Sequence, residues 1–154
     1  MDINHDTKKL FMYAILCLSL AVGLSSGVFS NYFKEVFAVD SVQRGLLEIP
    51  RETPGILCVV ILTALAGLGN LSLMVMAYGF CTLGLAVLGL LSPSYFIMQI
   101  FLFSFSLGEH MMMPLRDSIA MDLSGEGKTG TFLGQLKGRM TLSSMIASAA
   151  VFIG

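Results

Sequence analysis

The residue types best suited to chemistry stand close together in one short run. The run holds three ionisable residues and two prolines, Glu48, Pro50, Arg51, Glu52 and Pro54. An arginine among carboxylates can hold an anionic group or pair with an acidic neighbour. The bland alternative is a set of ion pairs whose long side chains reach toward lipid headgroups. We favour a binding or gating cluster over that interfacial set.

The apolar segment that follows, residues 56–68, is too short to cross a bilayer alone. Its roughly 13 residues reach about 20 Å as a helix, whereas the hydrocarbon core is about 30 Å thick. A span must therefore begin within the charged run. This places Arg51 and Glu52 inside the outer edge of the hydrocarbon and Glu48 just above it. Ionisable groups at such a depth are costly and become functional candidates.

Composition identifies the broad class. The 154 residues are 55% hydrophobic and 12% charged, with a mean hydropathy of +0.82, far from the roughly 25% charge of globular domains. Long apolar runs without strand-like alternation predict an all-α membrane protein, a polytopic transmembrane helix bundle in contact with lipid. The net charge of −1 gives no indication of a nucleic-acid partner.

Five spans are expected, at about residues 10–30, 46–68, 71–91, 94–115 and 130–154. Asp40 followed by Gln43 fits a capping box that starts the second helix near Ser41. Both prolines then fall inside that helix, where we expect a kink or a locally unwound turn. Ser92-Pro93 is typical of a helix start and precedes the fourth span.

A second group of ionisable residues lies near the inner end of the fourth span and just beyond it, Glu109, His110, Arg116 and Asp117. One hypothesis is a proton relay through Glu109 and His110, because histidine titrates near neutral pH. We favour the alternative, an inner-gate charge cluster in which Glu109 pairs with Arg116 and His110 with Asp117, since each pair is seven residues apart on one helix face.

The last span begins with Gly130, Gly134 and Gly138, whose spacing predicts close helix packing. About 15 residues follow Arg139, or roughly 22 Å of helix, so we expect an unfinished span and a fragment of a longer protein. The lone cysteines predict buried thiols and no metal site.

Basic residues predict the orientation of the five-span arrangement. One side carries Lys8, Lys9, Arg116, Lys128, Lys137 and Arg139, and the other carries Lys34, Arg44 and Arg51. The first side, with the N-terminus, is therefore expected to be cytoplasmic, in a plasma (bacterial inner) membrane.

The layout resembles the N-terminal half of a major facilitator superfamily transporter. The sharp part of the resemblance is the run from Leu46 to Gly55, which is similar to the start of the second helix in one bacterial branch of that superfamily. The looser part covers nearly the whole chain: a longer outer loop after span 1, a tight inner turn before span 3, a short outer turn before span 4 and a charged inner loop before span 5.

The resemblance implies a secondary active transporter of a small solute that works by alternating access. The chain would be an incomplete N-terminal domain, with a C-terminal half as partner, a proton or sodium ion as coupling ion and no cofactor. Glu48, Arg51 and Glu52 would line the outer mouth of the central cavity. No catalytic motif indicates an enzyme. The alternative is a non-transporting five-helix membrane subunit or assembly protein.

Overall fold

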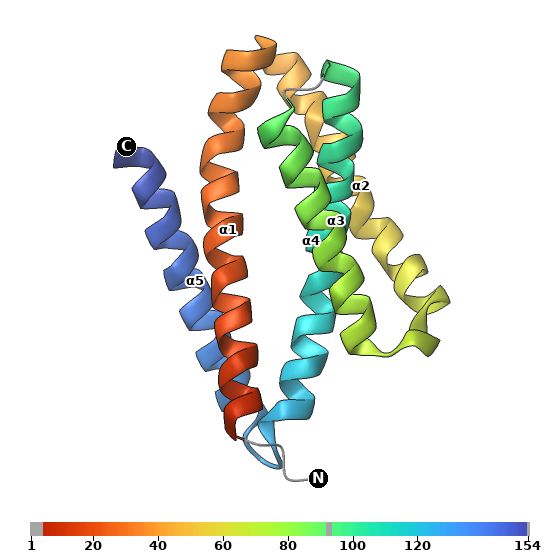
Figure 1. The fold of residues 1–154 in the computed structure, drawn as a ribbon, viewed down its shortest axis with the longest axis vertical. Coiled ribbons are helices and arrows are strands. Elements are labelled where there is room, and N and C mark those ends of the chain that lie inside the picture. Colours follow the sequence, from red (N-terminus) through yellow and green to blue (C-terminus); the bar gives the residue numbers. More distant parts are fainter. Residues whose placement is uncertain (1–4, 92–93, 154) are drawn as a thin grey trace. The chain divides into compact units, whose positions relative to one another are not determined.

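The computed structural model describes residues 5–91 and 94–153, and these are helical almost throughout. The elements are α1 (His5–Phe37), α2 (Ser41–Ala64), the short 3-10 helix η1 (Ala66–Leu68), α3 (Asn70–Leu90), α4 (Tyr95–Ser124) and α5 (Thr129–Ile153) (Figure 1). The predicted all-α class is confirmed. The predicted helix start at Ser92-Pro93 lies outside the described residues.

Three of the described helices, α1, α3 and α4, are long and apolar enough to cross a membrane. This supports the membrane class that the composition predicts. The other two helices, α2 and α5, do not reach that standard of hydropathy and charge. Each carries ionisable residues well inside its length, among them Arg51 and Glu52 in α2 and Lys137 and Arg139 in α5.

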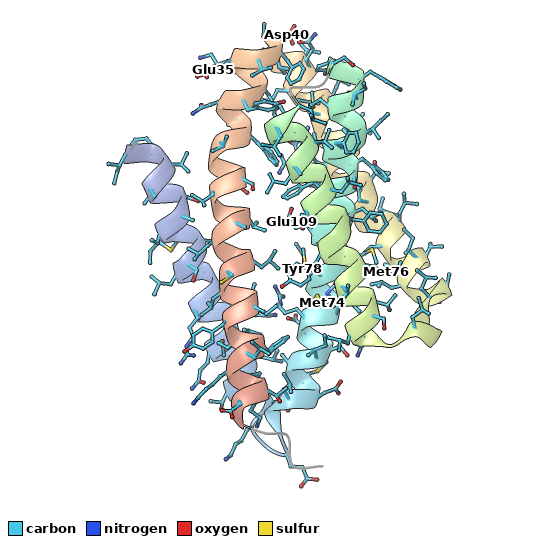
Figure 2. The ribbon with its side chains drawn as sticks, viewed as in Figure 1. Glu35, Asp40, Met74, Met76, Tyr78 and Glu109 are labelled. Carbon is cyan, nitrogen blue, oxygen red and sulfur yellow. The ribbon has the colours of Figure 1, made fainter. Side chains whose placement is uncertain are left out.

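The start of α2 confirms the predicted capping box. Asp40 precedes the first turn, and its Oδ1 accepts hydrogen bonds from the amides of Val42 at 2.9 Å and Gln43 at 2.8 Å. The Gln43 side chain returns the contact by accepting from the Asp40 amide at 3.1 Å. Figure 2 shows Asp40 at this end of the helix. These bonds satisfy amides that would otherwise lack partners, which fixes the helix start at Ser41.

The chain divides into two compact units. Unit 1 comprises the residues up to 33 and those from 120 onward, and so contains most of α1 and all of α5. Unit 2 comprises residues 34–119 and contains α2, η1, α3 and most of α4.

In unit 2, α4 packs closely against α3, and the two helices run antiparallel. A Cβ added at Gly84 would lie 2.7 Å from the carbonyl oxygen of Phe101, and one added at Gly108 would collide with the carbonyl oxygen of Ala77. The contact partners on α3 move back along the chain as those on α4 advance. Glycine is needed at both crossings because a side chain there would push the backbones apart.

In unit 1, α1 packs on α5 through the small residues of α1. A Cβ at Gly23 would lie 2.7 Å from the carbonyl oxygen of Ser144, and one at Gly27 would lie 3.1 Å from Val151 Cγ1. The Ser148 hydroxyl donates to the Gly23 carbonyl at 3.3 Å. The partners advance together along both helices, so α1 and α5 are parallel.

The glycines that we expected to form a packing seam in α5 do not form one within the described chain. No heavy atom outside their own turn lies within 4 Å of a Cβ added at Gly130, Gly134 or Gly138. The packing expected at these glycines therefore has no partner among the described residues, and it stays a prediction. In unit 1 the close approach of helices occurs at Gly23 and Gly27 of α1.

Candidate functional site

The ionisable residues of α2 and α4 meet in unit 2, where these two helices lie side by side and parallel. Arg51 of α2 is level with Ser106 of α4, and Gly55 is level with His110. Each step of four residues on one helix is matched by four on the other. The interface therefore brings together two sets of residues that lie more than fifty positions apart in the sequence.

The first contact is a hydrogen bond between the helices. The Ser106 hydroxyl donates to the backbone carbonyl of Arg51. Ser106 is buried, with 4% of its surface exposed, and this bond gives its hydroxyl hydrogen an acceptor within an apolar interface. Leaving such a group unsatisfied would cost about 1–3 kcal/mol.

His110 is the second contact, and both of its ring nitrogens have oxygen neighbours. Nδ1 lies 2.9 Å from the Ser106 carbonyl oxygen and 3.1 Å from Ser106 Oγ. Nε2 lies 3.9 Å from Oε2 of Glu52, on the facing helix. The His110 side chain is 22% exposed and that of Glu52 is 69% exposed.

Gly55 makes room for the imidazole. A Cβ added at this position would lie 2.9 Å from Cδ2 and 3.1 Å from Nε2 of His110. The ring is therefore seated directly on the backbone of α2. Any larger residue at position 55 would have to displace it.

Glu48 and Arg51 form an ion pair along α2. Nη1 of Arg51 lies 2.8 Å from one carboxylate oxygen of Glu48 and 3.0 Å from the other, and both side chains are about half exposed. The ion pair neutralises the guanidinium. Pairing with an acidic neighbour is one of the two roles that the sequence suggests for Arg51. A substrate anion that binds Arg51 would compete with Glu48 for it.

The prolines do not unwind α2. The helix is continuous from Ser41 to Ala64, so the locally unwound turn that we expected around Pro50 and Pro54 is absent. Pro54 is fully buried. Each proline still deprives a carbonyl four residues earlier of its amide donor, but neighbouring turns maintain the helix.

Glu109 adds a further carboxylate beside the contact. It lies about halfway along α4 (Figure 2) and is partly buried, within electrostatic range of His110, Arg51 and Glu52. The cluster around His110 thus contains two carboxylates, Glu52 and Glu109, and a guanidinium that is already paired. Such a balance of charge favours a cation or a proton over an anion next to the imidazole.

The predicted inner-gate pairs are not those that form. Arg116 pairs with its chain neighbour Asp117, at 2.7 Å from Nη2 and 2.8 Å from Nε to the same oxygen. Glu109 and His110 instead belong to the cluster at the α2 interface. Seven residues correspond to about 10 Å along a helix, which is too far for His110 to reach Asp117 while it stays seated on α2.

Sequence reasoning placed the two sets of ionisable residues at opposite ends of the membrane and missed Ser106 and Gly55. A signal for Ser106 was present, because Ser106 and His110 are four residues apart and so adjacent on one helix face. No such pattern in the sequence indicates which residues of α2 lie opposite which residues of α4, because this register depends on how both helices pack.

Within the described residues, no group of three or more histidine, cysteine, aspartate and glutamate side chains could hold a metal ion. Of the three cysteines, Cys58 and Cys81 are buried as expected, whereas Cys17 is exposed on α1.

Comparison with known proteins gives no relative: no family model, no curated protein and no solved structure matches the chain.

Proposed function

We propose that this chain is the N-terminal part of a secondary active transporter that moves a small solute across a membrane by alternating access. One observation carries the proposal: ionisable residues from two helices converge in the middle of a helical unit of a membrane protein. Such groups are costly in a membrane, and they characteristically mark substrate or ion pathways. Here they are Glu48, Arg51 and Glu52 on α2 and Glu109 and His110 on α4.

The helix directions in unit 2 support a multi-pass arrangement. Parallel α2 and α4 with an antiparallel α3 are what three successive crossings produce. The tight connection at the end of α2 fits this, because Gly69 adopts a positive φ of 77° that glycine tolerates readily and lets α3 begin at the next residue. α2 would then cross with its ionisable residues against α4.

In this proposal the two sets of residues have different roles. Arg51, held by Glu48, is the group that a substrate anion or an acidic gate residue would engage. Glu52, Glu109 and His110 would form the coupling-ion site. The superfamily resemblance implies about seven further helices, namely the last helix of the first half and the helices of a second half that completes the binding cavity.

A non-transporting five-helix membrane subunit is the second candidate. The observation that favours it is the open glycine face of α5, where Gly130, Gly134 and Gly138 leave room for a helix of another chain. A transporter could fill the same space with its own later helices, so the two candidates differ in what occupies this face.

A transport assay separates the candidates. The protein, expressed from its full reading frame, would be reconstituted into liposomes with an inward proton or sodium gradient and offered a labelled sugar, amino acid, dicarboxylate and lipophilic cation. We expect gradient-driven accumulation or extrusion of at least one solute, lowered at least tenfold by Arg51→Ala and retained in the matched variant Arg44→Ala. Absence of flux for every solute, together with stoichiometric co-purification of another membrane protein, would favour the subunit.

A further inference from the structure

The contacts of His110 determine which of its nitrogens carries the hydrogen in the neutral ring. The Ser106 carbonyl oxygen, 2.9 Å from Nδ1, can only accept a hydrogen bond. Nδ1 must therefore be the donor. In a neutral imidazole the other nitrogen, Nε2, then has no hydrogen and presents a lone pair.

The Ser106 hydroxyl leads to the same assignment independently. Its single hydrogen is donated to the Arg51 carbonyl, so toward Nδ1 at 3.1 Å it can act only as an acceptor. Both neighbours of Nδ1 thus require a hydrogen on it. The side chain and backbone of one serine fix the tautomer.

The unprotonated Nε2 faces a carboxylate. Oε2 of Glu52 lies 3.9 Å away, beyond hydrogen-bond distance but close enough for a small rotation of the exposed glutamate to close the gap. In the neutral state the two acceptors have no hydrogen between them. A proton added to Nε2 converts this into a charge-assisted bond from imidazolium to carboxylate, whose usual length is about 2.7–2.9 Å.

We propose that Nε2 of His110 is a proton-binding site, and that its occupation draws Glu52 onto the imidazole and fastens α2 to α4 beside Gly55. Ser106 is the positioning residue, since it holds the ring in the required tautomer. The ligand is a proton, and the bonds formed are Nε2–H and its hydrogen bond to Glu52.

The other charged and titratable groups around the ring favour a proton here. On α2, Arg51 is compensated by its ion pair with Glu48. On α4, Glu109 adds a carboxylate next to His110 in the chain. On α3, the titratable side chains are those of Tyr78 and Cys81, neither of which is cationic, and the Cys81 thiol donates to the Phe105 carbonyl at 3.3 Å. Around the ring, the carboxylates of Glu48, Glu52 and Glu109 therefore outnumber the single guanidinium of Arg51.

The coupling role of this site rests on the proposed function, which it deepens by naming a proton as the coupling ion. The proton site itself can be tested without transport. A chain that moved no solute could still bind a proton at Nε2, and a transporter could lack this site, so the two failures are distinguishable.

The test is nitrogen NMR of histidine in the membrane-embedded chain. The sequence holds two histidines, His5 and His110, so 15N-histidine labelling in lipid nanodiscs gives two sets of ring signals, assigned by loss of one set in His5→Gln. We expect, at pH 8, a hydrogen on Nδ1 and none on Nε2 of His110, and on acidification a hydrogen bond from Nε2–H to the Glu52 carboxylate.

Two variants test the role of the carboxylate. Glu52→Gln should weaken proton binding at Nε2 about two- to fivefold, the range for a partly exposed ion pair. Glu126→Gln is the matched control in the loop after α4 and should change it less than 1.5-fold by the same reasoning. A hydrogen on Nε2 at pH 8 would overturn the proposal, and so would equal effects of the two variants on proton binding. The position of the hydrogen at pH 8 is measured without any substitution in the site.

Discussion

Oε2 of Glu52 lies 3.9 Å from Nε2 of His110, across the interface between α2 and α4. The two residues are 58 positions apart in the sequence, and the parallel packing of their helices brings them together. On its own helix, each group of ionisable residues could be interpreted as surface charge. The contact between Glu52 and His110 brings the two groups together as one ionisable site in the middle of unit 2.

Of the two glycines in α2, Gly55 should be the less tolerant of an added side chain. Gly55→Ala places a methyl group 2.9 Å from His110 Cδ2, and we expect it to lower the free energy of unfolding by about 1–3 kcal/mol through overpacking. Gly45→Ala is the matched control in the same helix, because a Cβ there meets nothing within 4 Å. It should be neutral or stabilising by up to about 1 kcal/mol. Equal thermal shifts for the two variants in detergent would contradict the close approach.

The seam between α1 and α5 makes a second matched pair. Gly23→Ala would press against the Ser144 backbone at 2.7 Å and should destabilise unit 1 by about 1–3 kcal/mol. Gly134→Ala on α5 has open space and should stabilise the isolated chain slightly. The measurement is thermal unfolding of the purified chain. If Gly134→Ala destabilised the chain more than Gly23→Ala does, α1 and α5 would pack through the glycine face of α5 that we find open.

Ser106→Ala should loosen the tie between α2 and α4. The variant removes the hydroxyl that donates to the Arg51 carbonyl, which should cost about 0.5–1.5 kcal/mol. The control is Thr63→Ala, whose hydroxyl bonds within its own helix to the Val59 carbonyl at 2.8 Å on an exposed face. Its effect should stay within about 0.5 kcal/mol. Hydrogen exchange at the amides of residues 51–58 should rise only in Ser106→Ala, and protection unchanged from wild type would count against the bond.

The N-cap of α2 should depend on the chemistry of its side chain. Asp40→Ala removes the acceptor for the amides of Val42 and Gln43 and should cost about 0.5–2 kcal/mol. Asp40→Asn retains an oxygen acceptor and should recover most of that loss. Unfolding measured by circular dichroism compares the three proteins. A loss as large in Asp40→Asn as in Asp40→Ala would indicate that charge, and not capping, is what the position supplies.

Several features of this fold could be predicted from the sequence because their cause is local. The capping box needs only Asp40 and Gln43 three residues apart, and the apolar lengths predict the helices. The pairing of Arg116 was wrong because helix-face spacing allows several partners, and the adjacent Asp117 reaches the guanidinium more directly than Glu109 does.

The site could be predicted only in part. The residue types of α2 and α4 indicated functional groups. The register between the two helices, however, depends on where the side chains of α4 fit against both α2 and α3. Gly84 and Gly108 admit the α3 contacts, and Gly55 admits His110. Glycine spacing alone does not distinguish these from Gly130, whose face is open.

The measurement that tests the single α2–α4 site most directly is a disulfide cross-link in the membrane. In a chain whose native cysteines are replaced by alanine, Gly55→Cys would be combined with His110→Cys, or with Asp117→Cys as the register control about 10 Å further along α4. A disulfide needs Cβ atoms about 3.5–4.5 Å apart, and a Cβ at Gly55 lies 3.7 Å from Cγ of His110. We expect rapid oxidation of the 55–110 pair and little of the 55–117 pair. Preferential cross-linking of residues 55 and 117, or of neither pair, would contradict the single site.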